Sequence, residues 1–393
     1  MKKVLIFMRE NNISPKGGPA GYVYNLLKGI KKNEEVSFEL LPSINTNKKI
    51  RSKYNSLPAN IKSIYRVFGR LKDYIKINNP DMGIDSDYLK QFDAIHFHSC
   101  VSLYKNLNTL NEYKGIVILT THSPKPPHIE KIEDTYSNFE KRLYGKKHLR
   151  KYEIAVRESF LRADYIIFPC KEAEESYKNN WSEYDLVRRQ IINRIKYLPT
   201  GVDSCLEKIK TNRQEVRTKY KIPENAFVVS YVGRHNSVKG YDTLKRIAQQ
   251  FSKKDNIYFL IAGEEAPLKR PDLDYWIEVG WTNDPYSLEG ASDLFVLPNK
   301  ETYFDLVLLE VLSIGINVLV TDTGGNKYFK QFDGNIDFFN GVEDAKIKIQ
   351  EVKNRIKKNA SVSKNRDLYL KYFTSDIFAY NYVKLINDII LNH

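Results

Sequence analysis

Short apolar runs alternate with helical patterns along this sequence, and the alternation constrains its fold more than any other feature. The clearest unit has an apolar run over residues 293–298, a loop, a helical pattern over 306–313 and a second apolar run over 317–320. Apolar runs this short are typical of strands buried on both faces of a parallel sheet. The stretch therefore predicts a βαβ unit, and open parallel sheets bind ligands beyond the carboxyl ends of their strands.

The same alternation before this unit predicts two doubly wound α/β halves. The other expected strands cover residues 4–7, 38–41, 93–98, 116–122, 163–169 and 195–198 in the first half, and 227–232, 257–262 and 276–279 in the second. We expect a first domain over residues 1–200 and a second over 201–375. The last segment, 376–393, is predicted to be an aromatic-rich helix separate from both sheets.

The composition is that of a folded globular protein with an anionic partner. Of 393 residues, 42% are hydrophobic and 28% are charged, and the formal net charge is +14. This charge favours nucleic acid, an acidic membrane surface or a phosphorylated small molecule as the partner. Nucleic acid is disfavoured, because the basic residues are spread over many expected helices and the usual nucleic-acid-binding motifs do not occur.

Cysteine usage and the N-terminal segment indicate the cytoplasm. Cys100, Cys170 and Cys205 are far apart and odd in number, so we expect neither a disulfide framework nor a metal site. The apolar run after Lys3 is too short for the core of a signal peptide, and no run approaches a bilayer-spanning length. We expect a cytoplasmic protein that can also sit peripherally at the inner membrane face.

A basic segment, Lys48–Lys76, interrupts the alternation of strands and helices. Its lysines and arginines are interspersed with aromatic and aliphatic residues, and the part from 64 to 75 fits a basic amphipathic helix. Such a helix could lie on an anionic bilayer or line an acceptor groove. A solvated helix packed on its own domain is the equally open alternative.

In the first half, glycines and histidines follow the expected strands. Gly17 and Gly18 precede a helical pattern, and a glycine-rich turn there lets backbone N–H groups approach a phosphate. Their spacing does not match the dinucleotide-binding fingerprint, so a simple tight turn is the alternative. His98 and His122 end two expected parallel strands at the ligand edge of the sheet, and His122 is the better candidate for a site residue.

In the second half, basic residues and glycines follow the expected strands. Arg234 and Lys239 come after the strand at 227–232 and before a helical pattern, an arrangement that suits a diphosphate. Gly263 and Gly280 end the next two strands and leave room for a planar ring.

Carboxylates and a further glycine turn belong to the opening βαβ unit. Glu301 and Asp305 lie in its loop, and Glu310 lies on its helix. The second strand of the unit runs into Thr323–Asn326, a turn whose N–H groups could face a phosphate.

Together these features resemble the retaining GT-B glycosyltransferases of the bacterial group 1 family, which is similar to glycosyltransferase family 4. The segments that carry the resemblance are, in order, Gly17-Gly18, His98, His122, Pro199–Asp203, Val232–Gly240, Ile261–Gly263 and Leu297–Glu310. The resemblance implies two Rossmann-like domains facing a central cleft, with the nucleotide-sugar donor on the second domain and the acceptor mostly on the first. It also implies that the helix at 376–393 crosses back to the first domain.

The resemblance implies roles for individual residues as well. Arg234 and Lys239 would bind the donor diphosphate and stabilise the leaving group in place of a metal ion. Glu310 would hold the ribose hydroxyls, His122 would contact the transferred sugar or its phosphate, and Gly18 would admit the phosphate when the cleft closes. The remaining members of the predicted donor site are Gly17, Gly263, Glu301, Asp305, Leu306 and Val307. The nucleotide sugar is a co-substrate, and neither a further cofactor nor a protein nucleophile is implied.

The sequence departs from the family pattern at the first of two glutamates that are usually eight residues apart. Aligning Glu310 with the second glutamate places Thr302 at the first, with Glu301 displaced by one residue. A bulged loop could bring Glu301 into place, Asp305 could supply the carboxylate from the other side, or the sugar contact could be lost. We favour Glu301, because a loop readily absorbs a one-residue offset.

The resemblance leads us to expect a retaining, metal-independent glycosyltransferase. Its donor would be a nucleotide sugar of the UDP type, and its acceptor a hydroxyl of a bacterial surface glycan or glycoconjugate, either lipid-linked or protein-linked. A catalytically silent GT-B subunit that binds an active transferase or its acceptor is the main alternative, motivated by the altered glutamate. A nucleotide-sugar epimerase of the same fold is a further one.

Overall fold

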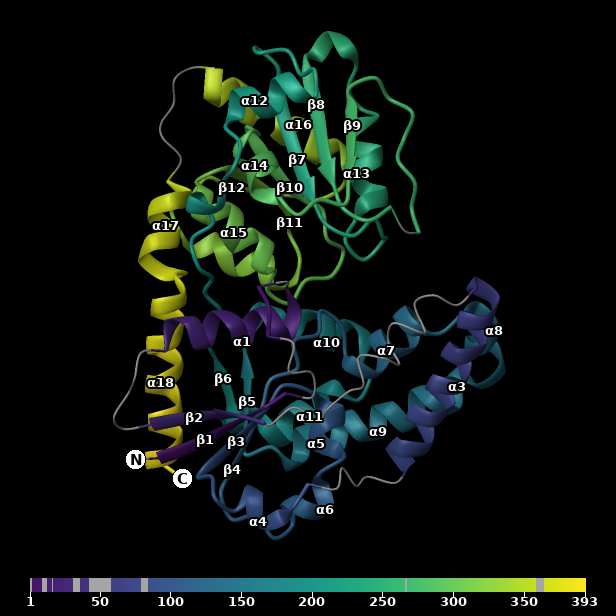
Figure 1. The fold of residues 1–393 in the computed structure, drawn as a ribbon, viewed down its shortest axis with the longest axis vertical. Coiled ribbons are helices and arrows are strands. Elements are labelled where there is room, and N and C mark those ends of the chain that lie inside the picture. The colour runs from purple at the N-terminus through teal and green to yellow at the C-terminus, as the bar shows by residue number, and fades with distance from the viewer. Residues whose placement is uncertain are drawn as a thin grey trace.

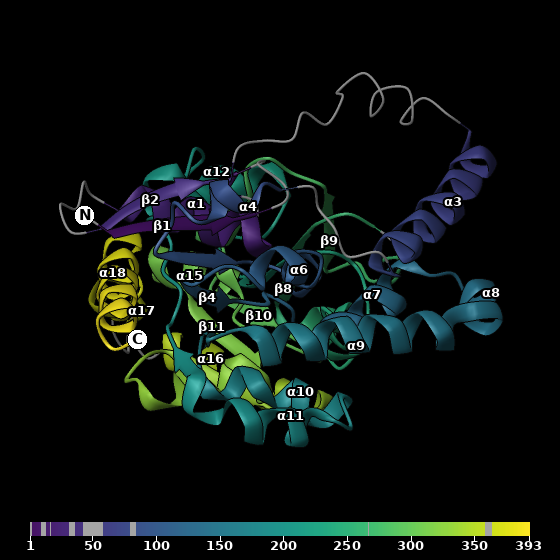
Figure 2. The same ribbon diagram turned by 90° about the horizontal axis from the view of Figure 1, so that it is seen from below.

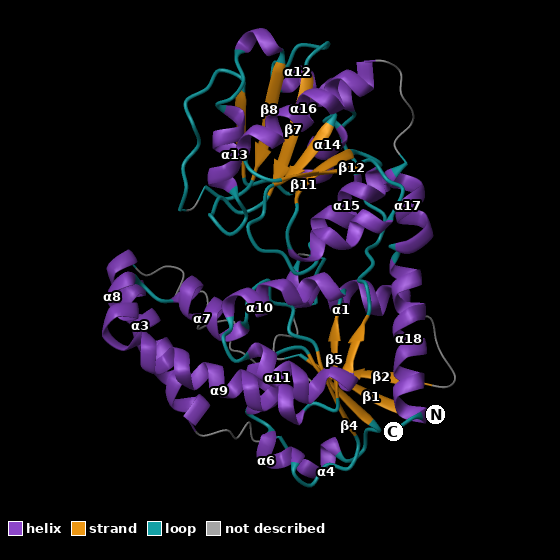
Figure 3. Cartoon of the chain, turned by 180° about the vertical axis from the view of Figure 1, so that it is seen from behind, coloured by secondary structure: helices purple, strands orange, loops and turns teal. Residues whose placement is uncertain are grey.

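A computed structural model describes residues 2–8, 13–15, 17–30, 36–41, 58–78, 84–265, 267–357 and 364–393. Within these ranges the chain forms two domains, each built on a six-stranded parallel sheet with flanking helices (Figures 1 and 3). The predicted doubly wound α/β class is confirmed.

The first sheet has the strand order β2-β1-β3-β4-β5-β6. Its strands are β1 (Lys2–Phe7), β2 (Val36–Leu40), β3 (Ala94–Phe97), β4 (Ile116–Leu119), β5 (Tyr165–Phe168) and β6 (Ile195–Tyr197). The second sheet has the order β12-β11-β10-β7-β8-β9. Its strands are β7 (Phe227–Val232), β8 (Ile257–Ala262), β9 (Trp276–Gly280), β10 (Leu294–Leu297), β11 (Asn317–Thr321) and β12 (Ile336–Phe339).

Every expected strand is present, and one was missed. β12 lies at the edge of the second sheet, where only its last residue is fully buried. Asp337 in this strand pairs with Arg355 at 2.7 Å. A half-buried edge strand with a charged residue lacks the continuous apolar run by which the other strands were found.

Helices flank both sheets. In the first domain they are α1 (Gly18–Gly29), α3 (Ala59–Asn78), α4 (Ser86–Leu89), α5 (Cys100–Tyr104), α6 (Leu107–Leu110), α7 (Pro127–Thr135), α8 (Asn138–Glu140), the π-helical η1 (Lys141–Gly145), α9 (Lys146–Arg162), α10 (Glu175–Asn180) and α11 (Tyr184–Ile191). In the second domain they are α12 (Arg213–Lys219), α13 (Tyr241–Ala248), α14 (Pro285–Gly290), α15 (Leu306–Ile314), α16 (Val342–Lys357) and α17 (Asn365–Tyr372), and α18 (Ser375–Leu391) follows.

The helix α18 returns to the first domain and completes its core (Figure 1). Its buried side chains, which join the core formed by β1 and α1, are Phe378, Ala379, Tyr382, Ile386 and Ile389. α1 and α18 cross closely, because a Cβ on Gly29 would lie 2.1 Å from the carbonyl oxygen of Ser375. Gly201 allows a second close crossing, since its Cβ would lie 2.2 Å from the carbonyl oxygen of Thr374.

The loop between β10 and α15 also ties the second domain to the first. Tyr303 of this loop is buried against Phe168 of β5, with the ring centroids 6.1 Å apart, and one apolar core continues through Tyr303 between the domains. Beside it, the carboxylate of Glu175 accepts a 3.3 Å hydrogen bond from the Gly324 N–H and pairs with Lys327. The two domains are therefore joined by packed side chains as well as by the segments of chain that run between them.

The helix α3 projects from the first domain at the end opposite to α18 (Figures 1 and 2). It is 20 residues long and so exceeds the expected helix at 64–75. The first part of the predicted basic segment, residues 48–57, lies outside the described residues. Among the helices within the described ranges, none has both the length and the apolar character that crossing a membrane requires.

Candidate functional site

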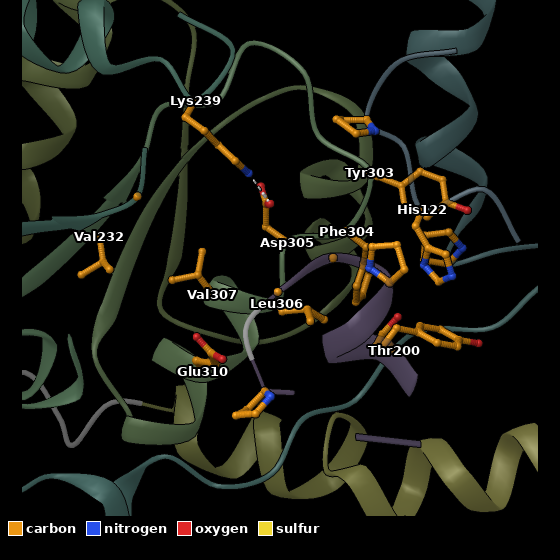
Figure 4. Close-up of a pocket in the computed structure, with 18 of the residues that line it drawn as sticks. His122, Thr200, Val232, Lys239, Tyr303, Phe304, Asp305, Leu306, Val307 and Glu310 are labelled. Atoms are coloured by element: carbon orange, nitrogen blue, oxygen red, sulfur yellow. Dashed lines mark hydrogen bonds and ion pairs between the residues drawn. The ribbon is translucent and has the colours of Figure 1, made fainter. Parts of the chain in front are cut away.

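A cavity of about 880 Å³ opens between the two domains, and both contribute to its wall (Figure 4). The first domain supplies Gly17, Gly18, Tyr22, Thr120, His122 and Thr200 among others. The second supplies Gly233, Arg234, Lys239, Trp281, Tyr286, Asp305, Leu306, Val307 and Glu310 among others. Many of these residues follow the carboxyl ends of parallel strands, the edge at which doubly wound sheets bind ligands. The volume suits a small-molecule site.

Arg234 and Lys239 form a cationic wall of the cavity. Both lie in the loop between β7 and α13, and Lys239 Nζ is 2.6 Å from Asp305 Oδ1 (Figure 4). The side chain of Arg234 is exposed, and within the described part of the chain no carboxylate pairs with it. A phosphate can therefore bind the guanidinium directly, whereas at Lys239 it has to compete with Asp305.

The loop carboxylates differ in placement. Asp305 faces the cavity and accepts a 3.1 Å hydrogen bond from Thr302 Oγ1. Glu301, which we favoured, does not line the cavity, because its Oε1 instead faces Asn180 Nδ2 at 3.4 Å across the domain interface. Burial of Tyr303 in the first domain fixes the loop in this form. The loop therefore brings Asp305, and not Glu301, to the cavity.

Glu310 reaches the cavity from α15 (Figure 4). Burial raises the pKa of its carboxyl from 4.5 to about 7, against a smaller lowering by the cation of Lys208. Nearby, Glu289 of α14 is wholly buried, and neither carboxyl oxygen has a hydrogen-bond partner among the described residues. Burial first, and Glu310 second, raise the pKa of Glu289 well above its ordinary value. Glu310 is therefore a cavity carboxyl whose charge changes near neutral pH.

We expect nucleoside diphosphate affinity to fall about tenfold between pH 8 and pH 6 if Glu310 accepts two ribose hydroxyls. Bidentate acceptance needs the carboxylate, and a group with a pKa of about 7 is mostly ionised at pH 8 and mostly protonated at pH 6. Calorimetric titration at the two pH values measures the effect. In the Glu310→Gln variant the pH dependence should shrink to that of the nucleotide itself; an unchanged dependence would contradict the assignment.

His122 and His98 form a hydrogen-bonded pair at the ends of β3 and β4. His98 Nδ1 is 2.7 Å from His122 Nε2, so Nδ1 of His122 is the ring nitrogen left for a ligand. Burial lowers the pKa of His122 to about 3, so the imidazole is neutral at physiological pH. The backbone of His122 has φ +57, a strained conformation for a residue other than glycine that is frequent at functional sites. His98 does not line the cavity.

The predicted glycines separate into two groups. Gly17 and Gly18 line the cavity at the N-terminus of α1, with φ +42 and +62. Backbone N–H groups at a helix N-terminus attract a phosphate. Gly263 does not line the cavity. It allows a close backbone contact instead, because a Cβ there would lie 1.8 Å from the Gly233 carbonyl oxygen. The Gly324 N–H in the turn at 323–326 is directed to Glu175 instead of the cavity.

Several residues that line the cavity were not predicted from the sequence. Trp281 directly follows Gly280 at the end of β9, lines the cavity and is 69% exposed, so its indole ring is open to a ligand. Thr200, in the segment Pro199–Asp203, and Tyr286 of α14 also line the cavity. A tryptophan immediately after the glycine that ends an expected strand was a usable signal for the first of these. Among the described residues, no three His, Cys, Asp or Glu side chains gather as metal ligands.

The two facing doubly wound domains and the cavity between them define the GT-B fold, and solved structures share it. The chain superposes with a TM-score of 0.66 on the crystal structure of Anabaena Alr3699/HepE in complex with UDP, at 14% identity over 99% of this chain and 100% of that one. It superposes with a TM-score of 0.58 on WaaG, a glycosyltransferase involved in lipopolysaccharide biosynthesis, at 15% identity over 98% and 99% of the chains.

The second domain carries the similarity to a known family. Residues 212–367 match the family model of the glycosyl transferases group 1. A UDP-Gal:alpha-D-GlcNAc-diphosphoundecaprenol alpha-1,3-galactosyltransferase of Escherichia coli is 28% identical over 168 residues, which cover 38% of this chain and 43% of that protein. The O-antigen biosynthesis glycosyltransferase WclY of Escherichia coli is 23% identical over 250 residues, which cover 60% and 63%. The chain therefore matches less than two thirds of each relative's length.

Proposed function

We propose that this protein is a retaining, metal-independent hexosyltransferase. It takes a sugar from a UDP-sugar and attaches it to a hydroxyl of a bacterial surface glycan or glycoconjugate. One observation carries the proposal: Arg234, Lys239 and Glu310 line a single cavity between two GT-B domains. Two cations suit a diphosphate, and a carboxylate suits the ribose hydroxyls.

The relatives support the choice of donor and acceptor. One is named for UDP-Gal and a diphosphoundecaprenol acceptor, and another for O-antigen biosynthesis. A structural neighbour was crystallised with UDP-glucose. By analogy we propose a UDP-linked donor and a lipid-linked glycan acceptor, with the enzyme working in the cytoplasm at the membrane face.

In the proposed reaction the acceptor oxygen attacks the anomeric carbon from the face that the phosphate leaves. The bond between the anomeric carbon and the phosphate oxygen breaks, and the acceptor proton passes to that oxygen. Arg234 and Lys239 stabilise the negative charge that grows on the departing diphosphate, which is the part of the barrier that fixed cations lower most. Glu310 holds the nucleoside, and neutral His122 contacts the sugar.

Nucleotide binding and donor turnover test this proposal. Titration with UDP, GDP and ADP should show one preferred nucleotide, with UDP expected, and a panel of UDP-sugars should show slow hydrolysis that persists in EDTA. Arg234→Ala should abolish that turnover. NMR of the product of transfer to an acceptor should show the anomeric configuration of the donor.

The alternatives make different predictions. A silent partner subunit would bind nucleotide or acceptor without turnover in the wild type. An epimerase would convert the sugar without any acceptor. If the protein binds none of the three nucleotides, the proposal that it is a glycosyltransferase is wrong.

A further inference from the structure

The projecting helix α3 carries an apolar stripe that faces away from the protein. Its members recur at helical spacings of four, three and four residues, and their exposed fractions are 57%, 65%, 46% and 53% for Ile64, Phe68, Leu71 and Ile75. Val67, beside them, is 40% exposed. Side chains three and four residues apart share one face of a helix, so these residues form a continuous outward surface.

The opposite face of α3 holds the helix to its own domain. Arg70 Nε is 2.8 Å from Glu140 Oε1, Ile77 is fully buried, and the ring of Tyr74 stacks on His148 at 3.8 Å between centroids. α3 therefore already packs on the first domain through another face, and the exposed stripe is not needed for that contact.

A second apolar surface stands beside α3. Phe139 of α8 and Leu143 of η1 are 72% and 67% exposed, and they flank the Glu140 that pairs with Arg70 of α3. Figures 1 and 2 show α3 and α8 together at the end of the first domain opposite to α18. We call the stripe of α3 together with Phe139 and Leu143 the apolar arm.

Exposed cations accompany the apolar arm. Lys72 lies one turn after Phe68, and the residues next to Leu143 include Arg142, Lys146 and Lys147, all of them exposed. The neighbouring acids are already paired: Glu140 with Arg70, and Asp73 with Lys131 at 3.4 Å. The apolar arm is therefore bordered by positive charge that nearby carboxylates do not cancel.

We propose that the apolar arm docks the protein on an anionic lipid bilayer. An exposed stripe of Phe, Leu and Ile bordered by Lys and Arg is the pattern by which a helix lies in the headgroup region, with its apolar face among the acyl chains. Apolar burial and attraction to anionic lipid act together there. A protein partner or a second copy of this chain would also cover apolar groups, but an anionic bilayer satisfies the bordering cations as well.

The inference gives the proposed enzyme a membrane-facing side, and it locates that side more narrowly than the Lys48–Lys76 segment does. The apolar arm combines α3 with α8 and η1, which lie outside the Lys48–Lys76 segment. The lysines of that segment alone therefore do not define it. Its test uses neither donor nor acceptor. A negative vesicle result would therefore not bear on the proposed reaction, and a negative turnover result would not bear on membrane docking.

Vesicle flotation with the full chain tests the proposal. We expect binding to vesicles of phosphatidylcholine and phosphatidylglycerol, weaker binding to phosphatidylcholine alone, and partial release by high salt. The double variant Phe68→Ser, Leu71→Ser should reduce binding about tenfold or more, because two buried apolar groups are lost. Phe139→Ser, Leu143→Ser should act in the same direction.

Leu186→Ser is the matched control, because Leu186 is 60% exposed on α11 of the same domain and lies outside the apolar arm. It should leave flotation unchanged, and all variants should keep the melting temperature of the wild type. Absence of binding to anionic vesicles, or equal binding by the Phe68/Leu71 variant, would overturn the proposal. Light scattering that shows a dimer which the same variant dissociates would assign the apolar arm to a second copy instead.

Discussion

Lys239→Met is expected to lower the rate of UDP-sugar turnover by about 100- to 1000-fold, with a smaller loss of nucleotide affinity. The ammonium group meets a diphosphate whose negative charge grows as the sugar leaves, so its removal costs more in the transition state than in the bound ground state. Methionine keeps the apolar stem of the side chain. The measurement is kcat and KM for donor hydrolysis, together with calorimetric binding of UDP.

Lys300→Met is the matched control for this effect. Lys300 pairs with Asp242 at 2.5 Å, as Lys239 pairs with Asp305, but Lys300 does not line the cavity. It should stay within about threefold of the wild-type rate, since an exposed ion pair contributes little to stability. If Lys239→Met and Lys300→Met are equally active, the diphosphate is not bound where we place it. Partial recovery in Lys239→Arg would support a role of charge.

Gly240→Ala is expected to destabilise the second domain more than Gly315→Ala, a substitution at another glycine with positive φ. Gly240 has φ +67, and a Cβ there would lie 1.7 Å from the backbone carbonyl oxygen of Pro298. The strained backbone conformation alone costs about 1–2 kcal/mol. The clash with a backbone atom forces the Lys239 loop away from β10, so we expect a total loss of about 3 kcal/mol or more. Thermal unfolding followed by circular dichroism measures it.

Gly315→Ala separates the two contributions. Gly315 has φ +91 at the end of α15, but its nearest neighbour to a new Cβ is the Arg366 Cβ at 3.4 Å. It should show the conformational cost with little steric cost, and so a clearly smaller fall in melting temperature. Equal falls for the two variants would mean that the loop relaxes around the new methyl group.

The strands other than β12 and the cationic wall of the cavity were predictable from local sequence. A strand buried on both faces is apolar along its length, as Leu294–Leu297 is, and a sheet edge then determines which loops meet. The positions of Arg234, Lys239 and Glu310 in the cavity follow from that topology. The two cations lie in the loop after a strand of the second domain, and Glu310 lies on the helix that follows another strand. The resemblance to a family added their roles, which the residues alone did not define.

The positions of Glu301 and Gly263 depend on contacts between elements that are distant in sequence. Glu301 lies away from the cavity because Tyr303, two residues later, docks on Phe168 of the other domain. Gly263 is required by the backbone at Gly233, directly after β7, which passes too close for any side chain. The exposed face of α3 was likewise not predictable, because amphipathic spacing does not tell which face of a helix packs.

The return of α18 to the first domain has a consequence for folding during synthesis. Residues 375–391 complete a core whose strands all lie within the first 197 residues, yet a ribosome makes them after the entire second domain. The second sheet is continuous in sequence and can close first. Until α18 emerges, the apolar sides of β1 and α1 remain open to chaperones or to neighbouring nascent chains. The domain made first is therefore the one that finishes folding last.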